Sequence, residues 1–134
     1  MLTNIDGMKV MRVLEATTRR VTETPNAVMT TLASPTLGQT ESSVWLVKMR
    51  SGVEGPVHAF DSELVWVITD GDGLLRHEDH ETVVRAGDTL VLPAGRMRQL
   101  IGGADGFDAI VVGRGGSSVT RADGDSAETP PWVA

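Results

Sequence analysis

The chain has 134 residues, a formal net charge of −6 and no cysteine. This length fits one domain with a single core, and the absence of cysteine excludes disulfide scaffolds, thiolate metal sites and cysteine nucleophiles. The excess of acidic over basic residues would repel a phosphate backbone, so no nucleic-acid partner is expected.

Hydropathy gives no sign of a membrane segment, because no apolar run reaches the ~20 residues that a membrane helix requires. The first residues also lack a basic cluster followed by an apolar stretch, which is the pattern of a secretory signal. The expected localisation is therefore the cytoplasm, with no membrane partner.

Short apolar runs rich in valine, leucine and threonine are separated by glycine and proline along most of the chain. This pattern predicts an all-β protein, because no long segment keeps the 3.6-residue period of an amphipathic helix. In chain order, the predicted strands are residues 9–14, 27–33, 44–50, 57–60, 64–69, 74–77, 82–85, 89–92, 98–101 and 107–112.

Glycine-rich segments between these strands predict tight turns, since glycine adopts positive φ at little cost. The predicted turns are residues 70–73, 85–88, 93–95 and 102–106. They indicate a series of antiparallel hairpins. Many short hairpins are typical of a closed barrel, which leaves no sheet edge exposed.

The composition changes after residue 112 to glycine, serine, aspartate and proline. Residues 1–112 are expected to form a single-domain barrel that includes the N-terminal strands, and residues 113–134 an extended tail. A tryptophan near the end of a tail would be costly to leave in water. We therefore predict that Trp132 packs on the barrel or on a second subunit.

Two groups of residues have spacings that resemble those of a known protein family. They are Gly52, His58, Phe60, Glu63 and Gly71 in the first group, and Gly87, Pro93, Gly95 and Arg98 in the second. Over residues 45–112 this arrangement resembles the two signatures of the cupin superfamily: glycine, His-x-His, glutamate and glycine, then glycine, Pro-x-Gly and histidine. The resemblance implies a double-stranded β-helix, or jelly-roll barrel. It also implies a homodimer, in which the strand at residues 8–14 would add to the partner's sheet edge.

The resemblance further implies a metal held by three histidines and a glutamate, and the sequence departs from that set. His58 matches the first histidine, whereas Phe60 and Arg98 occupy the positions of the other two. Counting back from the turn glycine places Leu64 at the glutamate position. Glu63 then faces outward, unless a bulge shifts the strand by one residue. We therefore predict no bound metal and no other cofactor.

Without metal ligands, the barrel interior is predicted to be an apolar pocket. Its predicted lining is Trp45, Val47, Met49, Phe60, Leu64, Trp66 and Met97, with Met29 as a further candidate. A guanidinium at Arg98 would need a carboxylate or a ligand anion there, and Asp61, Glu63 and a bound substrate are the candidates. Such a pocket suits a small apolar molecule with a carbonyl or carboxylate group.

The leading hypothesis is a metal-independent cyclase or isomerase acting on a polyketide-like metabolite in secondary metabolism. His58 would act as general acid/base or hydrogen-bond donor, and Arg98 would stabilise oxyanion charge. One alternative is a non-catalytic small-molecule-binding protein. Another is a metal-dependent dioxygenase or epimerase that uses His58, Glu63 and a third, unidentified group.

Overall fold

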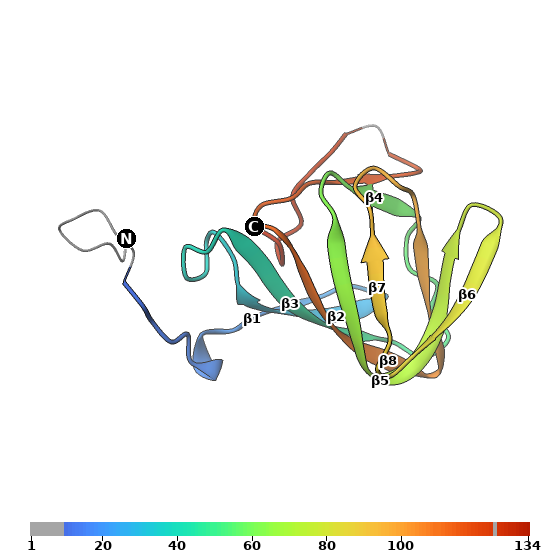
Figure 1. Cartoon of the computed structure of the whole chain (residues 1–134), viewed down its shortest axis with the longest axis horizontal. Helices are drawn as coiled ribbons and strands as arrows, with labels where there is room; N and C mark the ends of the chain where they lie inside the picture. The colour runs from blue at the N-terminus through green and yellow to red at the C-terminus, as the bar shows by residue number, and fades with distance from the viewer. Residues whose placement is uncertain (1–9, 125) are drawn as a thin grey trace.

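The computed structural model describes residues 10–124 and 126–134, and nearly all of their regular structure is β-strand. A larger antiparallel sheet has the strand order β1-β2-β3-β8-β5-β6, with β7 also paired to β5, and a smaller sheet pairs β4 with β9 (Figure 1). The predicted all-β class is confirmed. No helix in the described residues is long and apolar enough to cross a bilayer. The elements are a short 3-10 helix at Ala16–Thr18 and the strands β1 Arg20–Glu23, β2 Ala27–Ala33, β3 Ser42–Met49, β4 His58–Phe60, β5 Leu64–His77, β6 His80–Arg85, β7 Thr89–Leu92, β8 Gln99–Arg114 and β9 Val119–Arg121.

The predicted turns at residues 70–73 and 102–106 are wrong, because both segments lie inside long strands. β5 runs through the first and β8 through the second, and the two strands pair with each other. Gly71 (φ 77°) and Gly106 (φ 71°) have positive φ at this bend, where Gly71 pairs with Phe107 and the register shifts on either side. The glycines therefore bend the strands and curl the sheet around an interior, whereas a hairpin would reverse the chain.

The predicted strand at residues 9–14 is also wrong over its described part, residues 10–14, while Met8 and Lys9 lie outside the described residues. Met11 and Val13 are 102% and 87% exposed, so no sheet covers this segment, which extends away from the barrel in Figure 1. The first strand is instead β1, which is largely polar and lies at the sheet edge, where a strand needs no apolar face. A homodimer stays a prediction.

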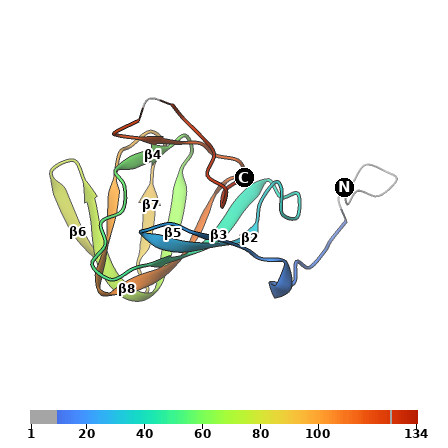
Figure 2. The ribbon, with the colours of Figure 1, turned by 180° about the vertical axis from the view of Figure 1, so that it is seen from behind.

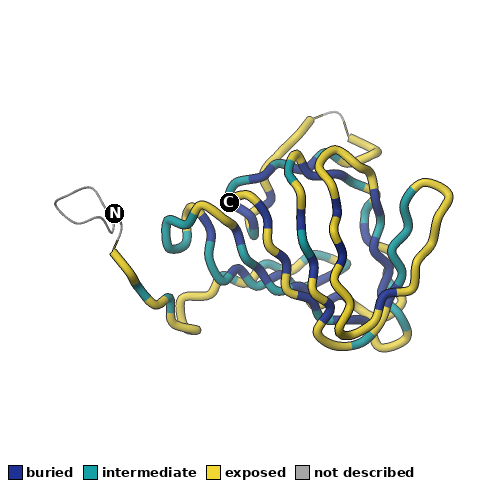
Figure 3. Tube along the Cα trace, in the orientation of Figure 1, coloured by how far each residue is buried: buried dark blue, intermediate teal, exposed yellow. Residues whose placement is uncertain are grey.

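Side-chain alternation along β3 is as predicted. Trp45, Val47 and Met49 are buried, whereas Lys48 and Arg50 face solvent. Figure 3 shows the same alternation of buried and exposed residues along the strands that surround the core. The inward residues of the larger sheet, together with Phe60 of the smaller one, form one hydrophobic cluster.

The C-terminal segment packs on the barrel. β8 continues to Arg114, and β9 pairs with β4, so residues 113–134 are less extended than predicted. Val133 is fully buried, and Trp132 is partly buried against the core cluster. Seen from behind in Figure 2, the segment crosses one side of the barrel and ends beside β2 and β3.

Candidate functional site

A pocket of about 360 Å³ lies between the two sheets, with walls that are mostly apolar. Side chains from β2, β3, β5 and β8 contribute from the larger sheet, and β4 and β9 contribute from the smaller one. Trp132 adds a wall from the C-terminal segment. The lining residues are Thr24, Pro25, Asn26, Ala27, Met29, Trp45, Val47, Met49, Gly55, Pro56, His58, Phe60, Trp66, Leu100, Val119, Arg121 and Trp132.

His58 is the only imidazole among the described residues that line this pocket. Its Nδ1 lies 2.7 Å from the main-chain oxygen of Pro56, an acceptor, so Nδ1 carries the proton and Nε2 has a free lone pair. Burial, then the charge of Arg98, lowers the pKa of His58 to about 4, and Arg121 adds to this effect. The neutral imidazole is therefore a proton acceptor toward the pocket. The predicted role as a donor in the resting state does not fit this tautomer.

Arg98 lies beside His58, because the two residues exchange main-chain hydrogen bonds between neighbouring strand segments. Its side chain is 3% exposed, and its Cζ lies 5.2 Å from the centre of the Phe60 ring. The Nε and Nη2 atoms are buried without a hydrogen-bond partner. Burial lowers the pKa of Arg98 to about 10, which leaves it charged at neutral pH. Unpaired buried donors of this kind are costly unless an acceptor arrives.

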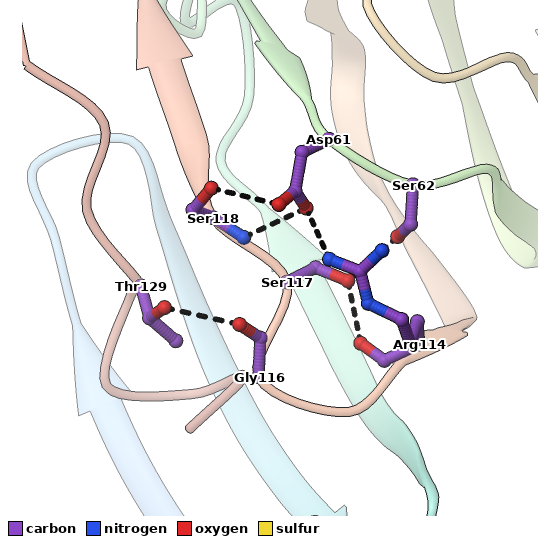
Figure 4. Close-up of polar contacts among 7 residues, drawn as sticks. All are labelled: Asp61, Ser62, Arg114, Gly116, Ser117, Ser118 and Thr129. Carbon is purple, nitrogen blue, oxygen red and sulfur yellow. Dashed lines mark hydrogen bonds and ion pairs between the residues drawn. The ribbon is translucent and has the colours of Figure 1, made fainter.

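The carboxylates predicted as partners of Arg98 lie elsewhere. Asp61 accepts a hydrogen bond from the main-chain N of Ser118 at 3.0 Å and pairs with Arg114 at 2.8 Å (Figure 4). Glu63 is exposed in the loop before β5, as strand parity predicts. A ligand anion remains as the predicted partner of Arg98.

Arg121 completes a row of three side chains. It is the register partner of His58 across the β4–β9 pair, on the side away from Arg98, and it lines the pocket. The neutral imidazole is thus flanked by two guanidinium groups, one buried and one exposed. Sequence reasoning missed Arg121, because it lies in the segment predicted as a tail and nothing in its local sequence links it to His58.

Most of the predicted apolar residues lie in the pocket wall. Trp45, Val47, Met49, Phe60 and Trp66 line the pocket, as does Met29. The indole Nε1 of Trp66 is buried without a partner, which places an unpaired donor in the pocket wall.

Two predicted lining residues are wrong. Leu64 is fully buried in the core and does not line the pocket, because at the start of β5 it packs against Gly113, where a Cβ would lie 2.3 Å from its Cδ2 atom. Met97 lies in the turn between β7 and β8 and is 40% exposed. It lines a separate hollow of about 200 Å³ beside Arg96, and Arg98 lines that hollow and not the larger pocket.

Solved structures with this architecture align over most of the chain. DMSP lyase DddQ from Ruegeria pomeroyi aligns with a TM-score of 0.69 and 18% identity, covering 80% of this chain and 64% of DddQ. An uncharacterized double-stranded β-helix protein from Klebsiella pneumoniae aligns with a TM-score of 0.66 and 16% identity, over 86% of this chain and all (100%) of that one. A sugar phosphate isomerase of the cupin superfamily from Silicibacter pomeroyi aligns with a TM-score of 0.59 and 21% identity, over 74% of this chain and 68% of the isomerase.

The chain has the cupin fold. The sequence itself matches no family model and no curated protein. The identities to the aligned proteins are low, so the likeness is one of architecture, and the chemistry of this chain depends on the residues of its own pocket.

The residues of this chain do not fit the metal that the resemblance to cupins implies. His58 supplies one imidazole, but Phe60 has no ligand atom and Arg98 adds a fixed positive charge next to it. Within residues 10–124 and 126–134, no group of three or more His, Cys, Asp or Glu side chains could hold a metal ion. The catalytic steps proposed for this chain therefore involve no metal ion.

Proposed function

We propose that this cupin binds a small apolar molecule that carries a carbonyl or carboxylate oxygen, and that it catalyses an isomerisation or cyclisation of that molecule. The observation that carries the proposal is the neutral imidazole of His58 in the lining of an apolar pocket, on the strand segment next to the buried Arg98, whose Nε and Nη2 atoms have no hydrogen-bond partner. A polyketide-like metabolite of secondary metabolism fits this description.

Binding would follow from the two kinds of surface in the pocket. The aromatic and aliphatic walls, which include Trp45 and Phe60, favour an apolar body by excluding water. Trp66 offers the pocket an indole N–H without a partner, and the unpartnered Arg98 donors lie next to His58, so a ligand oxygen that reached either group would relieve its desolvation cost.

Catalysis would use His58 as the base. With the ligand carbonyl held by Arg98, the His58 Nε2 atom takes a proton from the adjacent carbon, and the C–H electron pair moves to give an enolate on the carbonyl oxygen. Where a double bond conjugated with the enolate carries the electron pair further along the ligand, the His58 imidazolium returns the proton to the far carbon, and the ligand is isomerised. Alternatively, the enolate carbon attacks a second carbonyl, whose C=O π pair becomes an alkoxide as the new C–C bond closes the ring, and the alkoxide takes the proton from the His58 imidazolium. Burial and the charges of Arg98 and Arg121 lower the pKa of His58, which opposes the first step, but the negative charge of the enolate would offset the effect of the two arginines.

The aligned proteins offer general support only. One of them is a sugar phosphate isomerase and another is a DMSP lyase, so this fold carries such activities in those proteins. The specific reaction and its substrate are proposed here from the pocket alone.

The test is hydrogen exchange catalysed by the protein. We expect the full chain in D₂O to accelerate deuterium incorporation next to the carbonyl of benzylacetone, a small apolar ketone, as followed by NMR. His58→Gln should lose this acceleration by about tenfold or more, as is typical for loss of a general base. His77→Gln, in the β5–β6 hairpin outside the pocket, is the matched control and should keep it.

Two results would point to the alternative functions. Binding of the ketone with equal exchange rates in the wild type and His58→Gln would favour a non-catalytic binding protein. A stoichiometric transition metal in the purified protein would favour the metal-dependent dioxygenase or epimerase, although exposed Glu63 lies outside the pocket that contains His58.

A further inference from the structure

The inner face of the β2–β3 pair changes character along its length. Toward one end it is apolar and lines the pocket, and toward the other it carries hydroxyl groups that are fully buried. The apolar residues are Ala27, Met29, Val47 and Met49, and the hydroxyl residues are Thr31 and Ser43, with Ser34 just beyond the end of β2. Buried hydroxyls need partners, so these three residues mark a place built to receive polar groups.

The C-terminal segment supplies those partners through its main chain. Thr31 Oγ1 donates to the Trp132 oxygen at 2.8 Å, and Ser43 Oγ donates to the Val133 oxygen at 2.6 Å. Ser34 Oγ donates to the Ala134 oxygen at 2.6 Å. Three successive carbonyls are thus each matched to one buried hydroxyl, which fixes the register of the segment on the barrel.

Further contacts hold the segment on both sides of this row. Arg20 and Thr36 also donate to the Ala134 oxygen, at 2.9 and 2.6 Å. Before the row, Thr129 Oγ1 donates to the Gly116 oxygen at 3.1 Å. This bond lies near the group that Asp61 forms with Arg114 and Ser118, here called the Asp61 cluster (Figure 4). The backbone at residue 132 therefore has little freedom to move while these bonds are intact.

This seating places Trp132 in the pocket wall, where its side chain meets the apolar end of the lining. We propose that Trp132 sets the length of the apolar ligand that the pocket accepts, and that Thr31 and Ser43 are positioning residues that hold it there. The proposal rests on the proposed function, because it concerns the ligand of the same pocket. It adds that the far wall of the pocket belongs to the C-terminal segment and not to the barrel sheets.

The physical basis is that a ligand gains no further apolar contact once its chain reaches the wall of the pocket. Each ligand methylene that an apolar pocket buries raises the affinity about fourfold, until the ligand reaches the end of the pocket. Removing the indole of Trp132 moves that end outward, so longer ligands gain affinity while shorter ones gain none.

The experiment measures affinity across a series of straight-chain carboxylates, from hexanoate to hexadecanoate, by displacement of anilinonaphthalene sulfonate from the full chain. For the wild type, affinity should rise by about fourfold per methylene and then stop rising at a limiting length. Trp132→Ala should move that limit by at least two methylenes, Trp132→Leu by less, and Trp132→Phe by little. An unchanged limit in Trp132→Leu, or an equal loss of affinity at every length, would overturn the proposal.

The positioning role has its own readout. Thr31→Val keeps the shape of the side chain but removes the hydroxyl, so it should increase the limiting ligand length toward that of Trp132→Ala. Thr31→Ser keeps the hydroxyl and should have the limiting length of the wild type. Ser43→Ala should act in the same direction. A lower melting temperature with an unchanged limiting ligand length would show that these hydroxyls only stabilise the fold, and would overturn their assignment.

If the wild type binds neither the dye nor any carboxylate, the proposed function fails together with this inference. Binding by the wild type with an unchanged limiting length in the Trp132 variants would instead overturn only the role of Trp132.

Discussion

His58 and Arg98 donate main-chain hydrogen bonds to each other, with N···O distances of 3.0 and 2.9 Å. This reciprocal pair fixes the imidazole and the guanidinium side by side, and Phe60 lies beneath the guanidinium. The backbone therefore holds two basic groups on neighbouring strand segments, close enough for the charge of Arg98 to act on His58. Burial, and after it the charge of Arg98, lowers the pKa of His58 to about 4.

Stability should depend on pH through His58. Its pKa is about 4 in the folded protein, whereas an unfolded histidine titrates near 6.5, so between these values the unfolded state binds more protons. The free energy of unfolding should be highest above pH 6.5 and fall by up to about 3 kcal/mol as the pH falls toward 4. Urea unfolding at several pH values measures this. His58→Gln should flatten the slope and His80→Gln should keep it, so equal slopes in the two variants would contradict the assignment.

Replacing Arg98 by methionine should separate binding from stability. Arg98 is buried with unpaired Nε and Nη2 atoms, so Arg98→Met removes an uncompensated desolvation cost and should leave the melting temperature unchanged or raise it. Affinity for anilinonaphthalene sulfonate should fall by about tenfold or more, since charge-assisted hydrogen bonds are lost. The pKa of His58, followed by NMR, should rise. A large drop in melting temperature would show that Arg98 has a structural partner.

The Asp61 cluster should secure the segment that carries β9. Partial burial raises the pKa of Asp61, but hydrogen bonds from Ser118 and the charge of Arg114 outweigh it and hold the pKa below its usual value. The stabilisation from Asp61 is therefore present above about pH 4 and lost below it. Because the group is largely exposed, Asp61→Asn should lower the melting temperature by only a few degrees. It should also speed proteolysis near Ser118, and unchanged cleavage would argue against a securing role.

Two glycine substitutions should differ in cost although both positions have positive φ. A Cβ on Gly71 would lie 2.2 Å from the Gly106 oxygen, whereas a Cβ on Gly87 would meet nothing within 4 Å. Gly87→Ala should therefore cost only the backbone term, about 1 kcal/mol, and Gly71→Ala about 3 kcal/mol or more. Thermal unfolding of the two variants measures the difference. Equal losses would mean that the bend can widen freely.

Local pattern was enough to predict the face of β3 and the exposure of Glu63, because alternation along a strand is a property of a few neighbouring residues. It failed at residues 70–73, since an Asp-Gly pair suits both a hairpin turn and a glycine bend within a strand. Arg121 and Trp132 reach the pocket through pairing with distant parts of the chain, which no local pattern records.

The bends of β5 and β8 also constrain how the protein folds. Gly71 lies directly across the ladder from Phe107, next to Gly106, so neither strand can curve until the other is in register. Partners in this ladder, such as Leu64 and Gly113, are far apart in sequence, and closing so long a loop precedes most of the energetic gain. We therefore expect slow, all-or-none folding on a timescale of roughly milliseconds to seconds, with the concave interior created in a single late event.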